Sequence, residues 1–391
     1  MLGSVLAFIV GCALIFAAIR SAVRTFVVPR GGRPDSVTRS VFIVMRALLD
    51  LPLRRASETR REQALAYLAP VSLLSLPVVW LGFVLLGYTA IYRALGATSW
   101  SSAITISRLS LLYLGSNITG IEDGTVVGFS ETVLSLLLAA ILVSYLPAIY
   151  SAFSQREQQV TGLETLAGSP PAPVKMIKRF YLIKGLGHIS DVWPTWQAWF
   201  ETVEESHTAL IPLIFYRSPQ PHRSWVTAAG AILDTASIVS STLDMPRDAR
   251  AELCIRAGYL CLQRVATPLG VPFNPDPSPT DPISVSREEY DAVYDELVQL
   301  GVPVKPDRDQ AWQDFAGWRV NYDAVLIGLA VFTRAPEGVW SSDRVPYQRS
   351  PFVTASRSAR QAATAAMNGR LERPGNPPAG APLSPPERVK S

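Results

Sequence analysis

Three long runs without a charged residue constrain this chain more than any other feature. They cover residues 1–19, Ala64–Tyr92 and Thr132–Gln155. Each run is long enough to cross a hydrocarbon core of about 30 Å, which takes roughly 20 residues of helix. The composition agrees: 48% of the residues are hydrophobic and only 17% are charged, whereas soluble proteins average about 25% charged residues. The sequence therefore predicts an all-α membrane protein with three transmembrane helices.

The first run is predicted to be a retained transmembrane helix within residues 1–28 rather than a cleaved signal peptide. No Lys or Arg precedes its apolar core, and no small-residue cleavage site follows before Arg20 and Arg24. A signal peptide ordinarily has both features. We therefore expect the N-terminal span to remain part of the protein.

The loops on the two sides of the second run differ in charge. Between Arg24 and Ala64 there are nine Arg and four acidic residues, whereas Gly96–Phe129 holds one base, Arg108, and two acids. Loops rich in Arg and Lys remain in the cytoplasm. We therefore expect 29–63 to be a basic cytoplasmic loop, with the N-terminus outside and the C-terminal half in the cytoplasm.

A short apolar stretch, "SSAITISRLSLLYLG", begins at Ser101 and is followed by a loop that contains Gly120. The stretch is too short to span a bilayer. Two interpretations of it stay open. It is either a re-entrant pore helix, 101–116, followed by a filter-like loop, 117–124, or an amphipathic helix that lies on the outer surface of the membrane. In the first case 64–155 is a channel-like pore module.

Several further segments carry a resemblance to known proteins. They read "YLPAIYSAFSQRE", "LETLAGSPP", "WPTWQAWFETVEESH", "FYRSPQPHRSWVTAAGAILDTASI" and "FAGWRVNYDAVLIGLA". With them the chain resembles bacterial, chiefly actinobacterial, membrane proteins of the potassium-channel and two-pore-domain-channel families, from the second span to about residue 345. The resemblance implies a bacterial inner-membrane location, a homotetramer around a pore, and a filter whose carbonyls replace the water around K⁺.

On this family's pattern, the loop is a degenerate selectivity filter. Glu122 replaces the second filter Gly, and Ile118 replaces the Thr that donates a ligand oxygen. Gly enters the left-handed backbone conformation of a filter freely, whereas Glu enters it only with strain. At the remaining positions, Tyr113 matches the pore-helix Tyr, Gly120 the first filter Gly and Asp123 the closing Asp, whereas Thr119 replaces Val and Ile121 replaces the aromatic residue. The resemblance therefore implies an ion pathway of Thr119, Gly120, Ile121, Glu122 and Asp123.

The altered loop leaves its function open. Glu122 and Asp123 would attract cations if they formed an acidic ring at the outer mouth, but Asp123-Gly124 is also ordinary turn chemistry. The first hypothesis is a potassium-channel-like protein that conducts K⁺ or other monovalent cations with weak or altered selectivity. The alternative is a non-conducting membrane anchor or sensor whose cytoplasmic helical domain binds a partner.

Pro147 lies in the third apolar run, near its predicted cytoplasmic end. It cannot donate a hydrogen bond to the Val143 carbonyl and favours a kink there. We predict a gating hinge at this residue, with a kink that only shapes packing as the plainer alternative.

The chain beyond the third run predicts a cytoplasmic α-helical domain, 156–340. The third span is expected to continue as a charged helix until Gly168. Asp234 should be hydrogen-bonded inside a buried core helix, because an ionisable residue at membrane depth is costly, and Ser286 with Glu289 reads as a capping box. Helical patterns cover 174–187, 193–216, 222–243, 247–267, 286–300 and 307–333, and the Trp residues 193, 196 and 199 share one face that predicts core.

The sequence offers little support for an enzyme. Its histidines are His188, His207 and His222, which lack metal-ligand spacing, and it has no Gly-rich phosphate loop. Its cysteines, Cys12, Cys254 and Cys261, are predicted to be buried small apolar residues. We expect no catalytic residue, no cofactor and no metal.

The C-terminal tail, 341–391, contains many Pro, Gly, Ala and Ser residues, with eight bases and three acids. This composition is typical of disorder. The charge of the tail accounts for a sequence pI near 9.0 without a nucleic-acid partner, and on the cytoplasmic side it would favour anionic lipid. The expected partners are thus the lipid bilayer, monovalent cations and further copies of the chain.

Overall fold

The computed structural model describes residues 2–26, 36–53, 58–112, 124–220 and 222–344. The elements in these ranges are helices, and the ranges contain no β-strand beyond one isolated bridge between Leu243 and Val304. The predicted all-α class is therefore confirmed. Three of the described helices are long and apolar enough to cross a membrane, within Leu2–Thr25, Pro70–Ala94 and Val126–Ala167. They indicate a membrane protein, as predicted.

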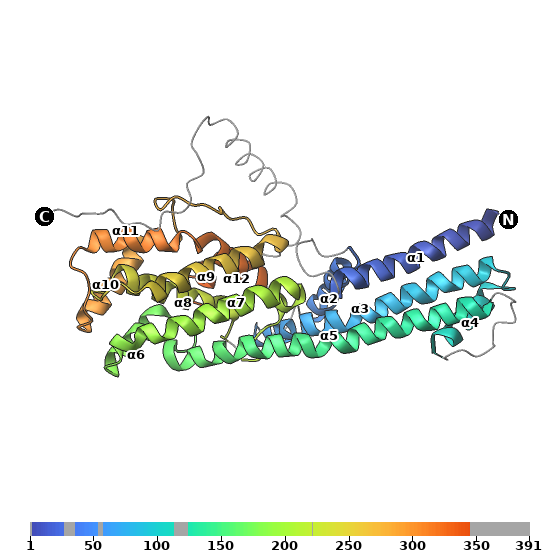
Figure 1. Cartoon of the computed structure of the whole chain (residues 1–391), viewed down its shortest axis with the longest axis horizontal. Helices are drawn as coiled ribbons and strands as arrows, with labels where there is room; N and C mark the ends of the chain where they lie inside the picture. The colour runs from blue at the N-terminus through green and yellow to red at the C-terminus, as the bar shows by residue number, and fades with distance from the viewer. Residues whose placement is uncertain (1, 27–35, 54–57, 113–123, 221, 345–391) are drawn as a thin grey trace, which may run out of the picture. The chain divides into compact units, whose positions relative to one another are not determined.

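The first two apolar helices, α1 (Leu2–Phe26) and α3 (Glu58–Ala94), lie side by side (Figure 1). Their backbones approach closely at Gly11 and Gly87, where a Cβ on Gly11 would lie 2.5 Å from the Gly87 carbonyl oxygen. Small residues permit this approach between apolar helices. The Trp80 indole N–H of α3 also donates to Ser21 Oγ of α1 at 3.0 Å, in a buried contact.

Helix α2 (Ser36–Leu53) lies inside the segment 29–63, for which the sequence predicted only a basic loop. It packs against α3, and the hydroxyl groups of Thr25 and Thr38 meet at 2.8 Å between α1 and α2. Because α2 combines apolar residues with scattered Arg, its hydropathy did not distinguish it from the surrounding polar segment.

The third apolar helix, α5 (Gly124–Ala167), continues without interruption for 44 residues. That length corresponds to about 66 Å at 1.5 Å per residue, roughly twice the apolar thickness of a bilayer. Gly168 follows with φ +81°, a conformation that Gly adopts without steric cost. The predicted continuation of the third span to Gly168 is therefore confirmed, and α5 itself leads into the C-terminal helices.

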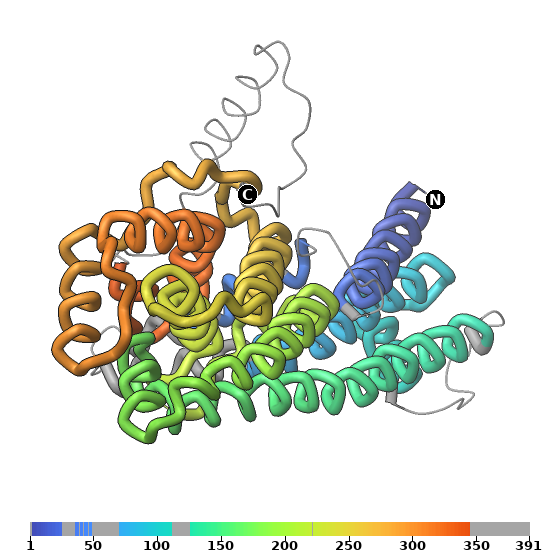
Figure 2. The backbone as a smooth tube through the Cα atoms, turned by 60° about the vertical axis from the view of Figure 1, so that its left-hand side comes forward, coloured from blue at the N-terminus to red at the C-terminus, as the bar shows by residue number. Residues whose placement is uncertain are grey.

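The C-terminal helices pack around α8 (Trp225–Ser241), in which every residue except Ser240 is buried. Helices α6, α9, α11 and α12 contact it (Figure 2). The predicted helix 193–216 is divided into α7 and the short 3₁₀ helix η2, and 307–333 is divided into α11 and α12. The bounds are α6 Pro173–Leu182, α7 Trp193–Ala209, η2 Ile211–Phe215, α9 Ala249–Ala266, α10 Arg287–Gln299, α11 Arg308–Arg319 and α12 Asp323–Thr333.

The predicted core residues differ in burial. Trp193, Trp196 and Trp199 are buried, as expected from their shared face. Cys254 and Cys261 are buried and free, but Cys12 is exposed on α1, so its predicted burial is wrong. The first residues of the predicted tail, 341–344, belong to the ordered domain: Ser341 is fully buried, and Arg344 binds Glu289.

Candidate functional site

The residues of the predicted ion pathway, Thr119–Asp123, lie outside the described residues, as do Tyr113 and Ile118. Their role therefore stays a prediction. The structure describes the helices on both sides of this loop. The helix before it, α4, covers Trp100–Leu112, within the predicted pore helix 101–116 apart from its first residue, and the helix after it is α5.

Helix α4 contacts α3 and α5 through buried and partly buried oxygen atoms. Ser107 Oγ lies 3.1 Å from the Leu85 carbonyl oxygen of α3 and 2.5 Å from Glu131 Oε1 of α5. One turn further along α4, the hydroxyl groups of Ser110 and Tyr92 are 3.2 Å apart. The hydroxyl group of Thr132 donates to the Ser110 carbonyl oxygen at 2.5 Å. We call Leu85, Tyr92, Ser107, Ser110, Glu131 and Thr132 the α4 cluster.

Glu131 is the carboxylic acid of the α4 cluster, and it is completely buried. Its Oε2 has no hydrogen-bond partner among the described residues. An ionisable side chain buried inside a membrane-spanning helix is costly and therefore points to function. Glu131 is not among the site residues predicted from the sequence, although it is a lone acid directly before the uncharged run Thr132–Gln155.

Pro147 lies inside α5, and the helix continues on both sides of it. Its side chain is exposed, whereas the neighbouring Tyr145 and Ile149 are buried with Leu213 of η2. The gating hinge at Pro147 stays a prediction. The contacts around it show that the C-terminal helices begin to cover α5 close to this residue.

Nine residues beyond Pro147, Arg156 is fully buried where α5 meets α7 and η2. Its guanidinium group donates to the carbonyl oxygens of Leu213 at 3.1 Å and Tyr216 at 2.7 Å. It also donates to Glu157 Oε1 at 3.0 Å, and its Nη1 lies 3.2 Å from His207 Nε2. We call this set the Arg156 joint, because it attaches α5, just beyond its uncharged run, to α7 and η2 of the helical domain.

His207 is fully buried in the Arg156 joint. Its Nδ1 lies 2.9 Å from the Val203 carbonyl oxygen, which can only accept, so Nδ1 carries the proton and Nε2 accepts from Arg156. Burial, followed by the charge of Arg156, lowers the pKa of His207 well below its usual value. This imidazole is a neutral packing partner. His188 and His222 are both exposed.

The buried neutral state of His207 predicts sensitivity to acid. The unfolded chain takes up a proton on this imidazole below about pH 6.5, whereas the folded chain resists it. The stabilising contribution is therefore present above that pH and is lost as the pH falls, by up to about 1.4 kcal/mol per pH unit. As the pH falls, the unfolding temperature of His207→Gln is expected to decrease less steeply than that of wild type. His188→Gln, at an exposed histidine, is the control. Equal slopes for wild type and His207→Gln would contradict this.

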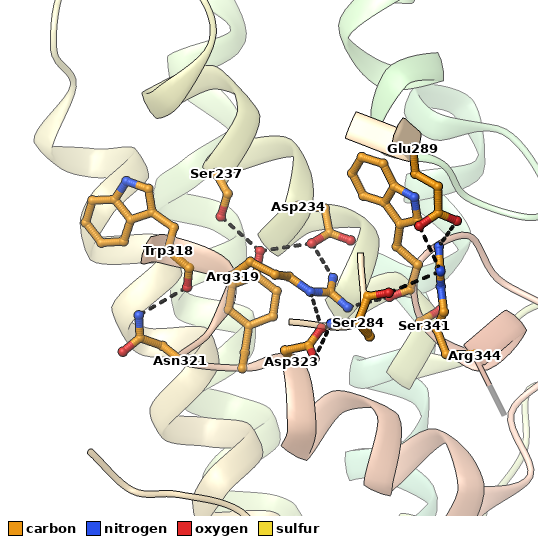
Figure 3. A network of polar contacts seen from close by, with 12 residues as sticks. Asp234, Ser237, Ser284, Glu289, Trp318, Arg319, Asn321, Asp323, Ser341 and Arg344 are labelled. Carbon is orange, nitrogen blue, oxygen red and sulfur yellow. Dashed lines mark hydrogen bonds and ion pairs between the residues drawn. The ribbon is translucent and has the colours of Figure 1, made fainter. Parts of the chain in front are cut away.

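The domain core contains a second buried network, centred on Arg319 (Figure 3). Its guanidinium group donates to Asp234 Oδ1 at 2.5 Å, to Asp323 Oδ1 at 2.7 Å and to the Trp340 carbonyl oxygen at 2.5 Å. The Tyr322 hydroxyl group also donates to Asp234 Oδ1, at 2.9 Å. The prediction that Asp234 is a hydrogen-bonded core residue is confirmed.

This network connects distant segments of the domain. The Asp323 carboxylate accepts from both the backbone N–H and the hydroxyl group of Ser284, at 2.9 and 2.6 Å. Desolvation opposes the charge of Arg319, but the nearby carboxylates of Asp234 and Asp323 outweigh it and raise its pKa above the usual value. The groups of this network bind one another, and the network therefore holds α8, α11 and α12 together.

Within the described ranges, no group of three or more His, Cys, Asp or Glu side chains is placed to hold a metal ion. No protein-family model matches the chain, and searches of curated proteins and of solved structures found no match either. The functional argument therefore depends on the order of the helices and on their contacts.

Proposed function

We propose that the chain is a potassium-channel-like integral membrane protein that conducts monovalent cations with weak or altered selectivity. The observation that carries this proposal is the position of α4. With 13 residues, it is too short to cross a bilayer, yet it packs against two helices that are long enough to do so.

The positions of the contacting residues along α3, α4 and α5 favour a re-entrant α4 over one that lies on the membrane surface. Leu85 lies nine residues before the end of α3, which is about 14 Å along a helix. Ser107 and Glu131 each lie seven residues after the start of their helices, about 10 Å along them. Since Ser107 contacts both other residues, α4 runs back beside α3 from their short connection.

The direction of the α4 side chains agrees with this interpretation. A helix on the bilayer surface turns its polar groups toward water and headgroups. The hydroxyl groups of Ser107 and Ser110 instead meet α3, and that of Ser107 also meets Glu131 of α5, whereas Arg108 of α4 is exposed. The C-terminal end of a helix also carries partial negative charge, so the end of α4 at Leu112 favours a nearby cation.

The proposed assembly follows from the single short helix. One such loop cannot surround an ion alone, so we propose a homotetramer in a bacterial inner membrane, with Thr119–Asp123 around the axis. The nine Arg between Arg24 and Ala64 support a cytoplasmic location for that segment and, after two further crossings, for the helical domain. The N-terminus then lies outside.

The test is potassium and sodium flux into liposomes that contain the full chain, beside a variant in which residues 118–122 are rebuilt as Thr-Leu-Gly-Phe-Gly. We expect wild-type flux of both ions, and a shift toward potassium in the variant, because the rebuilt loop regains its second Gly and a ring of ligand oxygens. Empty liposomes are the control. A silent wild type beside a conducting variant would contradict conduction by the native loop.

A second candidate function is favoured by the Arg156 joint. The continuous helix α5 is fastened to α7 and η2 by a fully buried guanidinium group, an arrangement suited to a non-conducting anchor or sensor that transmits displacement of a span to a partner-binding domain. Silence of both wild type and variant in the flux assay would favour this candidate.

A further inference from the structure

Glu131 lies where α3, α4 and α5 meet, and the groups around its carboxyl group are oxygens rather than cations. Ser107 Oγ is 2.5 Å from Oε1. Tyr92 of α3 lies near the carboxyl group, and its hydroxyl group meets that of Ser110 at 3.2 Å. Among the described residues no Lys, Arg or His forms an ion pair with Glu131. Arg108, beside Ser107 on α4, is exposed.

The remaining titratable groups near this contact are also without positive charge. Tyr88 of α3 bonds Ser130 at 2.9 Å and lies within electrostatic reach of Glu131 and of Cys12 of α1. Glu122 and Asp123 lie outside the described residues. An ionised Glu131 would therefore be a buried charge without a counter-charge among the described groups, an arrangement that proteins avoid.

The hydrogen atoms at Ser107 lead to the same conclusion. Its hydroxyl group has one proton but lies within hydrogen-bond distance of two acceptors, the Leu85 carbonyl oxygen at 3.1 Å and Glu131 Oε1 at 2.5 Å. Both contacts are hydrogen bonds if Glu131 carries a proton on Oε1 and donates it to Ser107, which then donates to Leu85. A neutral carboxyl group also tolerates the unpartnered Oε2 better than a carboxylate does.

We propose that Glu131 is a proton-binding site that fastens α4 to α5. The bound proton completes a chain of two hydrogen bonds from α5 through α4 to α3. Its removal places an uncompensated negative charge at the meeting point of the three helices and leaves Ser107 with two acceptors for one proton. Alkaline conditions are thus expected to loosen α4, the helix that precedes the predicted filter-like loop, 117–124.

The experiment is infrared spectroscopy of the full chain in lipid vesicles at neutral pH, in the region of the carbonyl stretch of protonated carboxylic acids. Wild type is expected to show such a band, and Glu131→Gln is expected to lose a component of it. Exposed Glu205→Gln is the matched control and should leave the band unchanged. An identical band in wild type and Glu131→Gln would overturn the proposal.

If Glu131→Gln fails to fold, Ser107→Ala gives an independent readout. This variant removes the acceptor of the carboxyl proton, so a component of the band is expected to shift in frequency, and an unshifted band would overturn the proposal. Neither measurement depends on ion flux. A protein that passes no ions but shows the band retains the proton site and loses only the proposed conduction.

Discussion

Replacement of Arg319 by Met is expected to lower the free energy of unfolding of the helical domain by about 3–5 kcal/mol, the usual cost of removing one partner from a buried ion pair. The guanidinium group is fully buried and serves three acceptors on α8, on α12 and at Trp340. Without it, the carboxyl groups of Asp234 and Asp323 remain enclosed without a counter-charge. Met keeps most of the apolar volume, so the loss reports mainly the missing charge and donors.

Tryptophan fluorescence during denaturant or thermal unfolding of the full chain measures this loss. Seven of the nine Trp residues lie between residues 193 and 340, so the signal comes chiefly from the domain. Arg308→Met is the matched control, because Arg308 is 38% exposed and pairs with Asp295 at the surface, where an ion pair contributes about 0–1 kcal/mol. Equal small effects of the two substitutions would contradict the structural role of Arg319.

Replacement of Arg156 by Met is expected to have an effect of similar size, about 3–5 kcal/mol, at the joint between α5 and the domain. The substitution leaves the carbonyl oxygens of Leu213 and Tyr216, and His207 Nε2, without their donor. Arg156→Lys should restore little, because one ammonium group cannot reproduce the planar fork of donors.

The measurement for Arg156 is the same unfolding experiment, combined with limited proteolysis of the segment 209–217. Arg156→Met is expected to be cleaved there faster than wild type, since Arg156 ties this segment to α5. Arg250→Met is the control, because Arg250 is 50% exposed and binds Asp248 and Asp191 at the surface. Wild-type stability and cleavage rate in Arg156→Met would show that the joint is held by other contacts.

Much of the fold could be predicted because it depends on local composition. The charge-free runs of the sequence became α1, α3 and α5, since about 20 apolar residues in a row have few soluble alternatives. The shared face of Trp193, Trp196 and Trp199 predicted core correctly, because helical periodicity fixes a common side. The end of α5 at Gly168 followed from the conformational preference of Gly.

The polar contacts were harder to predict, because they depend on partners distant in sequence. Asp234 was expected to be hydrogen-bonded, but its partner Arg319 is 85 residues away. Arg156 follows an apolar run and was expected only as part of the charged continuation of the third span. His207 and Leu213, more than 50 residues later, contact it. The burial of Glu131 likewise depends on a contact with another helix, at Ser107. Thr119–Asp123 lie outside the described residues.

The most direct test of the central claim is the flux of potassium and sodium through the wild-type full chain in liposomes, measured separately for each ion. The account predicts flux of both ions above that of empty liposomes, with weak discrimination between them, because Glu122 and Ile118 replace residues that a selective filter requires. Absence of flux for both ions, from protein shown to be folded by its tryptophan fluorescence, would contradict conduction.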